Sequence, residues 1–202
     1  MSAKGTRLAV TSMISMAGRK WIPWQEMVGG QTTGAATTLV GLGAGGPVSV
    51  AKIGKNGSEF GLSGLGIGAS ADEFAAYIGD IYDWDLTKTI IIEPHVYVDH
   101  AQAAADALSF VTTVLAVKTR PSAANSLDIA TVVAATTEAT ALTVAATDLA
   151  GIVQMTGHTI AGATLTSNDG GLLIQLVATL TTASADEFAL VGLNVKYTKR
   201  LV

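Results

Sequence analysis

The chain has 202 residues, of which 49% are hydrophobic and 14% charged, with no cysteine and a formal net charge of −4. These values exclude intrinsic disorder of the whole chain, a disulfide framework, thiolate metal sites and cysteine nucleophiles. The mean hydropathy of +0.45 comes from Ala and Val scattered among Thr and Gly rather than from a membrane-spanning run, so much of the surface is expected to face other proteins.

The first 35 residues predict a basic arm. Its bases are Lys4, Arg7, Arg19 and Lys20, and residues 1–20 contain no acidic residue. The apolar stretch after Arg7 is short and interrupted by Ser and Thr, so we expect no export signal. The sequence WIPW follows, and Trp21 and Trp24 either anchor the arm to a protein surface, in the same chain or the next, or make a local core contact.

Residues 31–68 are rich in Gly and Thr and predict loops with short strands or an extended arm. Gly41, Gly43 and Gly46 match the spacing of a dinucleotide-binding loop. That loop needs a preceding strand and a following helix, whereas Pro47 begins an extended segment here. We therefore interpret the glycines as part of a flexible or closely packed loop.

A strand is predicted over residues 89–100, TIIIEPHVYVDH. Ile90, Ile92, Val96 and Val98 alternate with polar or amphipathic residues, with Ile91 as the exception, which is typical of a strand with one buried face. Pro94 lacks an amide donor, so we expect this strand to lie at a sheet edge or to be bulged there.

Further strands are predicted along the rest of the chain. They cover residues 107–119, 140–146, 152–155, 172–180 and 188–197, and Asn168, Asp169 and Gly170 predict a turn. In the last strand, Val191, Leu193, Val195 and Tyr197 are expected on one face. Residues 122–138 fit either a short helix or a loop and strand. Many strands without a sustained helical pattern favour a β-sandwich or barrel.

The heptapeptide ASADEFA occurs at residues 69–75 and again at residues 183–189. Two corresponding loop-to-strand corners of a sandwich would explain the repeat. Its carboxylates at Asp72, Glu73, Asp186 and Glu187 also fit a metal site in principle, but a loop Asp bonded to its own backbone is the simpler interpretation.

Catalytic chemistry has no positive support in the sequence. A metal site could use His95 with His158, although nothing in their spacing demands it. Asp83 and Asp85 lie two residues apart beside Tyr82 and Trp84, which indicates a packed corner rather than an acid–base pair. We therefore expect no enzymatic activity, no metal and no cofactor.

Charge is segregated along the chain. The last seven residues contain Lys196, Lys199 and Arg200, whereas the chain between the two basic ends has 5 bases and 16 acids. Basic ends can bind nucleic acid, but the bases are few and no arginine-rich pattern accompanies them. We interpret them as segments that dock on the acidic body of a neighbouring subunit, with solvated tails as the alternative.

Two stretches resemble a group of tailed-phage virion proteins with a jelly-roll fold. The first is IYDWDLTKTIIIEPHVYVDH with ADALSFVTTVLAVK after it, and the second is HTIAGATLTSNDGGLLIQLVATLTTASADEFALVGLNVKYTKR. The shared features are an Asp-rich turn opening a strand, an Asp–Gly turn before residues 172–180, a polar loop like 183–187, and a last strand with a Tyr like Tyr197. The resemblance covers roughly residues 80–200, and its motifs are structural. The Ala-rich segment 122–138 and the Gly-rich start depart from it.

The resemblance implies a capsid decoration or cement protein that assembles as a trimer in a virion, with itself and a major capsid protein or another virion protein as partners. The expected fold is an all-β jelly-roll sandwich over residues 36–202, after a basic arm over residues 1–35. A tail or fibre part, a carbohydrate-binding jelly roll, a cupin-like metalloenzyme and a major capsid protein remain alternatives. We expect neither a membrane nor nucleic acid as partner.

Overall fold

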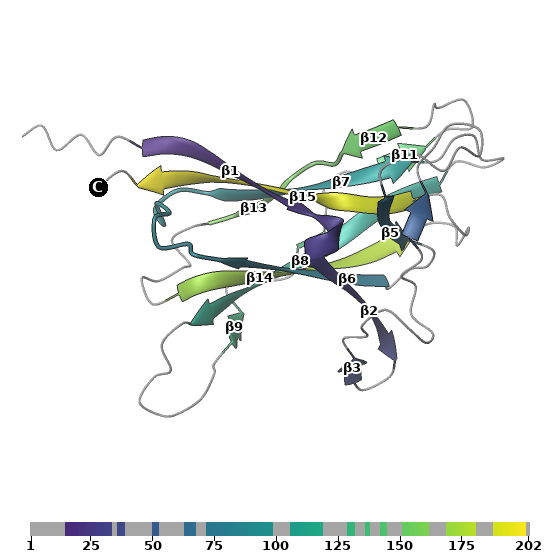
Figure 1. The fold of residues 1–202 in the computed structure, drawn as a ribbon, viewed down its shortest axis with the longest axis horizontal. Coiled ribbons are helices and arrows are strands. Elements are labelled where there is room, and N and C mark those ends of the chain that lie inside the picture. The colour runs from purple at the N-terminus through teal and green to yellow at the C-terminus, as the bar shows by residue number, and fades with distance from the viewer. Residues whose placement is uncertain are drawn as a thin grey trace, which may run out of the picture.

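The chain forms two antiparallel sheets packed face to face, shown as an upper and a lower layer in Figure 1. The structure, a computed structural model, describes residues 15–33, 36–38, 50–52, 63–67, 72–98, 106–118, 129–131, 136–137, 142–144, 151–161, 169–180 and 188–200. The predicted all-β class is confirmed. Among these residues the only helix is the 3₁₀ turn η1 (Trp24–Glu26), so no helix there has the length that crossing a membrane requires.

Sheet A has seven strands and sheet B has eight. Sheet A contains β1 (Ser15–Pro23), β4 (Val50–Lys52), β5 (Ser63–Ile67), β7 (Ile90–Val98), β12 (Gly151–Gln154), β13 (His158–Ile160) and β15 (Phe188–Arg200). Sheet B contains β2 (Met27–Thr33), β3 (Ala36–Thr38), β6 (Asp72–Gly79), β8 (Asp106–Lys118), β9 (Ile129–Thr131), β10 (Thr136–Thr137), β11 (Leu142–Val144) and β14 (Asp169–Leu180).

The strand order is that of a jelly roll. β9, β10 and β11 pair with successive parts of β8, and β12 and β13 pair with successive parts of β7, so each group acts as one interrupted strand. Apart from β2 to β5, sheet A then runs β1, β15, β7, β12–β13, while sheet B runs β6, β14, β8, β9–β11. β5 and β4 extend sheet A from β15, and β2 and β3 extend sheet B from β6. Strands that follow each other in the chain thus alternate between sheets or cross over a neighbour, as in the double Greek key of a jelly roll.

The core lies between the sheets and is almost entirely aliphatic and aromatic. Its largest fully buried side chains are Phe74, Phe110, Phe188, Ile22, Ile67, Ile78, Ile81, Ile92, Leu108, Leu172, Ile174 and Leu176. Phe74 and Phe110 meet edge to face with ring centroids 6.5 Å apart. The predicted alternation in residues 89–100 and 172–180 is confirmed, because Ile90, Ile92, Val96 and Val98 and the even-numbered residues of β14 face this core.

Both copies of the repeated heptapeptide lead into a strand that adds a phenylalanine to the core. Phe74 enters from β6 in sheet B, and Phe188 enters from β15 in sheet A. Asp72 of the first copy is fully buried. Asp186 and Glu187 of the second copy lie outside the described residues, as does most of the Gly-rich segment with Gly41, Gly43 and Gly46.

Two details of the predicted strands differ in the structure. β7 lies between β15 and β12–β13, so Pro94 is not on an edge strand. Its missing donor instead faces the break between β12 and β13, where the Met155 amide donates to the Pro94 carbonyl at 2.9 Å. β15 has a register shift between Leu190 and Gly192. This irregularity turns Val191 away from the core, so the prediction that Val191 shares a face with Leu193 is wrong.

The described part of the N-terminal segment contributes a strand to each sheet and is not a detached arm. Of the expected arm over residues 1–35, residues 15–23 form β1 in sheet A and residues 27–33 form β2 in sheet B. Ile22 and Met27 are buried in the core, and this burial holds both strands in the sandwich. Lys4 and Arg7 lie outside the described residues.

Candidate interaction surface

The two basic segments of the chain lie side by side along one margin of sheet A. β1 pairs antiparallel with β15, which places Arg19 opposite Lys196 and Ser15 opposite Arg200. Figure 1 shows β1 directly beside β15 over this stretch. Residues at opposite ends of the sequence therefore form one surface, which the charge pattern alone did not reveal.

An acidic side chain on β7, the neighbour of β15 on the side away from β1, pairs with one of the two facing bases. Glu93 is only 6% exposed, forms an ion pair with Lys196, and accepts a hydrogen bond from Asn194 Nδ2 at 2.8 Å. Like charges directly opposite in a sheet repel, so this pairing offsets the repulsion between Lys196 and Arg19. Lys196 is thus engaged within the fold, whereas Arg19 is exposed to solvent.

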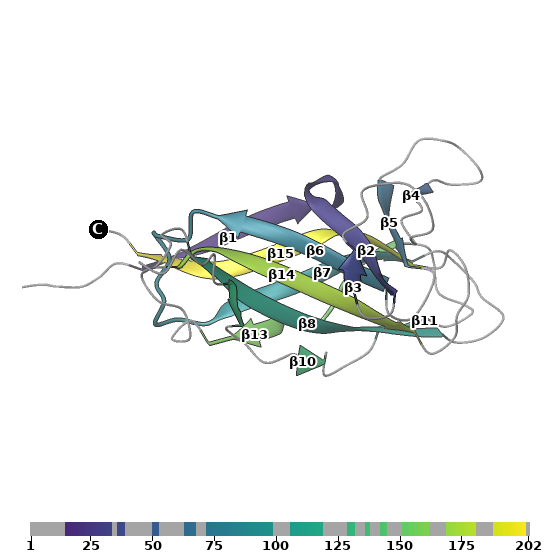
Figure 2. The same ribbon diagram turned by 90° about the horizontal axis from the view of Figure 1, so that it is seen from below.

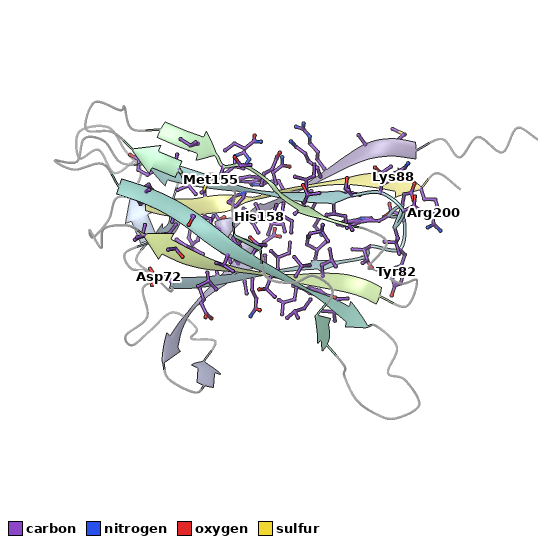
Figure 3. The ribbon with its side chains drawn as sticks, turned by 180° about the vertical axis from the view of Figure 1, so that it is seen from behind. Asp72, Tyr82, Lys88, Met155, His158 and Arg200 are labelled. Atoms are coloured by element: carbon purple, nitrogen blue, oxygen red, sulfur yellow. The ribbon has the colours of Figure 1, made fainter. Side chains whose placement is uncertain are left out.

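Lys199 and Arg200 contact the turn between β6 and β7. Lys199 Nζ lies 3.0 Å from Asp83 Oδ2, and this hydrogen bond raises the pKa of Lys199. The Arg200 amide donates to the Asp83 carbonyl at 2.7 Å. Both ends of the Lys199–Asp83 pair are well exposed, so this pair adds little to folding stability. Arg200 lies at the same end of the molecule as Tyr82 and Lys88, opposite Asp72 (Figure 3).

The turn itself is a packed corner, as the sequence predicts. Trp84 is buried and stacks on Tyr197 with ring centroids 4.0 Å apart and an interplanar angle of 12°. Asp85 accepts hydrogen bonds from the Thr87 hydroxyl at 2.7 Å and the Thr87 amide at 3.0 Å, and these bonds lower the pKa of Asp85. A carboxylate with a lowered pKa is poorly suited to general acid catalysis at neutral pH.

The two tryptophans of WIPW have different environments. Trp24 is half-buried and packs against the core, whereas Trp21 is 46% exposed on the outer face of sheet A. Trp21 meets His95 edge to face at 5.0 Å, and a Cβ at Gly192 would lie 2.7 Å from the Trp21 indole. Trp24 therefore makes the local core contact, and Trp21 contributes to the surface.

The histidines do not converge on one site. His158 pairs with Ile92 and shares its core-facing side (Figure 3), whereas His95 pairs with Gln154 on the outer face of sheet A. Burial lowers the pKa of both. A metal site built from His95 and His158 is therefore incompatible with the sheet geometry, and no group of three potential metal ligands occurs among the residues that the structure describes.

The outer face of sheet B is nearly uncharged in the part whose side chains the structure describes. The outward-facing residues of β6, β8 and β14 include Val111, Leu115, Val117, Leu173, Val177 and Tyr77. Among the outward side chains described on these three strands, Glu73 is the only charged one. The described outward side chains of these three strands are therefore poor in charge.

No protein-family model matches the sequence, and no curated protein sequence is significantly similar to it. Among solved structures, one of the infectious bursal disease virus Gx strain is 10% identical with a TM-score of 0.39, covering 99% of this chain and 38% of that chain. The subviral particle of infectious bursal disease virus VP2 is 12% identical with a TM-score of 0.37, covering 99% of this chain and 37% of that one. An unassembled KI polyomavirus VP1 pentamer is 10% identical with a TM-score of 0.24, covering 92% of this chain and 93% of that chain. The assignment of the fold rests on the strand order described above.

Proposed function

We propose that this chain is a structural protein of a virion rather than an enzyme. The observation that carries the proposal is the jelly-roll strand order. Jelly rolls recur in viral capsid proteins, in lectins and in cupins. The opposite orientations of His95 and His158 disfavour a cupin metal centre. The nearly uncharged face of sheet B favours a chain whose surface is covered by other proteins, as in a shell.

Within that class, we propose a decoration or cement protein that binds the capsid of a tailed phage as a symmetric trimer. The resemblance of residues 80–200 to tailed-phage jelly-roll virion proteins supports the phage origin. The basic margin of β1 and β15 supports docking on an acidic neighbour, which is another copy, the major capsid protein or another virion protein. Tail or fibre parts and major capsid proteins are the alternatives within the virion.

Imaging of the source particle tests this proposal. Particles are purified, the chain is identified in them by mass spectrometry, and its density is located by electron microscopy. We expect trimeric density on the outer surface of the head. Density in the tail would replace the decoration role, and absence of the chain from purified particles would contradict a virion role altogether.

A carbohydrate-binding jelly roll is a second candidate, because one exposed aromatic lies beside polar side chains. Trp21 pairs directly with Asn194, which contacts Glu93. Aromatic faces flanked by hydrogen-bonding groups suit sugar rings. A glycan array compares the full chain with the Trp21→Ala variant. Binding that disappears in the variant supports this function, and an array without binding eliminates it.

A further inference from the structure

β1 is the longest of the described strands that lie at the margin of a sheet. It has nine residues, whereas the others have two to four each. It pairs with β15 from Ser15 to Pro23 without a register shift, and no described strand pairs with its other side. Figure 2 shows β1 along one long side of the molecule. Alternate residues of an antiparallel strand direct their backbone groups to opposite sides, so about half of the residues of β1 present them outward, on what we call the β1 edge.

The two bases of β1 have no ion-pair partner in the part of the chain that the structure describes. Arg19 is exposed and Lys20 is half-buried. The neighbouring strand differs, because Lys196 and Lys199 of β15 each pair with a carboxylate within the fold. Successive side chains of a strand point to opposite faces, so each face of the sheet carries one base at the β1 edge. The uncompensated positive charge of this margin therefore lies on β1.

These bases restrict which strands can pair with the β1 edge. Antiparallel contact between β1 of two copies would bring Arg19 and Lys20 of both copies close together, and like-charge repulsion opposes this. The other described strands at the sheet margins contain neither Asp nor Glu. A second copy therefore offers no acidic strand at its described margins, and an acidic strand of another protein is the better match.

Exposed hydrophobic side chains lie on both sides of the two bases along β1. Met16 is 54% exposed and Trp21 is 46% exposed. Trp21 shares a face of the sheet with Arg19, and Met16 shares the opposite face with Lys20. An added strand would cover part of both hydrophobic side chains, so the matching strand has apolar residues on either side of its acidic pair.

We propose that the β1 edge receives an extended acidic segment of another virion protein, which adds a strand to sheet A. This inference rests on the proposed virion function and names the chemistry of the partner. Two adjacent acidic residues of the added strand lie opposite Arg19 and Lys20, and apolar residues lie opposite Met16 and Trp21. Main-chain hydrogen bonds to β1 supply affinity, as in other cases of strand addition, while the two bases reject basic strands.

Synthetic peptides test the β1 edge on the full chain. The acidic probe is TVEETTVT, whose two glutamates lie opposite Arg19 and Lys20 when the peptide runs antiparallel to residues 15–22. The charge control is TVKKTTVT. Two further acidic peptides are methylated on the amide nitrogens of either the odd or the even residues, so that each lacks the donors of one side of the strand. Binding is measured from the backbone amide NMR signals of residues 15–22.

We expect the acidic peptide to shift these signals and to bind at least about tenfold more tightly than the lysine peptide, which is a difference of about 1.4 kcal/mol. One methylated peptide should retain binding and the other should lose it, because only one set of amides faces β1. Equal binding of the acidic and lysine peptides, or of the two methylated peptides, would overturn the proposal. So would the absence of any shift at about 5 mM peptide, where a millimolar Kd already gives mostly bound chain.

A charge reversal on the protein locates the binding. Arg19→Glu changes the β1 edge, and Lys88→Glu on the turn between β6 and β7 is the matched control. Both side chains are exposed, so both variants should fold. We expect Arg19→Glu to weaken binding of the acidic peptide by about three- to tenfold, and Lys88→Glu to weaken it by less than about twofold. Equal weakening by the two variants would mean that overall charge, rather than the β1 edge, attracts the peptide.

Hydrogen exchange in the purified particle separates this inference from the proposed function. Mass spectrometry compares amide exchange of residues 15–22 in the free chain and in the particle. We expect slower exchange in the particle, because the outward amides of β1 gain hydrogen-bond partners there. Unchanged exchange in a particle that contains the chain would overturn the edge proposal and leave the virion function intact. Equally slow exchange in a purified oligomer of this chain alone would assign the edge to a second copy and also overturn it. Absence of the chain from the particle would contradict the proposed function, and the peptide measurements would then decide the edge.

Discussion

The outer faces of the two sheets differ in the polarity of their side chains and in the contacts that those side chains make. On sheet B, the outward side chains that the structure describes are mostly half-exposed and apolar, and Glu73 is the charged one among them. On sheet A, the outer face contains a buried Glu93 held by Lys196 and Asn194, a Trp21–His95 contact, and a small buried cluster of Tyr97, Ala189 and Val191. On the outer face of sheet A, polar and charged side chains therefore lie where the two basic segments meet. Substitutions on the outside should consequently be better tolerated on sheet B than on sheet A.

The largest contrast is expected between the inside and outside of sheet B. Phe110→Ala removes a fully buried ring that contacts Phe74 and should lower the free energy of unfolding by about 3–5 kcal/mol. Tyr77→Ala removes a ring that is 52% exposed and should cost less than about 1 kcal/mol. Chemical denaturation of both variants measures the difference. Similar losses would mean that the outer face of sheet B is covered in the folded chain.

The outer faces should differ in their response to loss of a polar side chain. Lys196→Met leaves the buried carboxylate of Glu93 without its cation and should cost roughly 1–3 kcal/mol, because Lys196 is itself partly exposed. Gln175→Met on the outer face of sheet B is the control and should change stability by less than about 0.5 kcal/mol. Equal denaturation midpoints for the two variants would contradict a structural role for the Glu93–Lys196 pair.

A glycine in each sheet gives a third comparison. A Cβ at Gly192 would lie 2.5 Å from the Ile22 carbonyl oxygen, whereas a Cβ at Gly79 would meet nothing closer than the Tyr77 ring at 3.5 Å. Gly192→Ala should therefore force β1 away from β15 and cost about 1–3 kcal/mol. Gly79→Ala should be close to neutral. Thermal unfolding of the two variants compares them directly, and a neutral Gly192→Ala would show that β1 docks more loosely than the structure indicates.

The smallest expected effect is a dependence of stability on pH that originates in sheet A. His95 and His158 have a folded pKa lowered from 6.5 by burial, so the unfolded chain binds protons more readily near that pH. The free energy of unfolding should therefore fall as pH drops below about 6.5, by at most about 1.4 kcal/mol per pH unit for each histidine. Denaturation between pH 7.5 and 5.0 measures this slope.

The double variant His95→Gln with His158→Gln identifies the source of that slope. Ordinary carboxylates titrate below about pH 5, so they contribute little in this window. We expect the variant to have a nearly flat stability profile from pH 7.5 to 5.5. A slope equal to that of the unsubstituted chain would assign the effect to groups outside these two positions.

The sequence predicted the fold where alternation was strong. β7 and β14 could be placed with their core faces because an aliphatic residue recurs at nearly every second position of both strands, although Ile91 and Leu173 lie between core positions. β1 was missed because Met16, Gly18 and Lys20 precede Ile22 on its inner face, so little apolar periodicity marks it as a strand. The bulge at Val191 was also hidden, since a single extra residue leaves the apolar pattern of β15 intact while reversing its faces.

The surface was predictable only in part. The bases of both ends were identified, and so was the packed corner at Asp83 and Asp85, because local spacing determines both. The pairing of Arg19 with Lys196 and the contact of Trp21 with His95 depend on strand register between distant segments, which no local pattern encodes. The exposed Ile152 and Val153 look like core residues in the sequence, and only the topology places them on an edge strand.

Light scattering of the purified full-length chain tests the central claim, which is that copies of this chain assemble with one another as the proposed structural protein. The account predicts a molar mass that is a fixed multiple of the 20.5 kDa monomer, which is three monomers for the proposed trimer. A mass of 20.5 kDa for the unsubstituted chain at every concentration, up to the millimolar range, would contradict it.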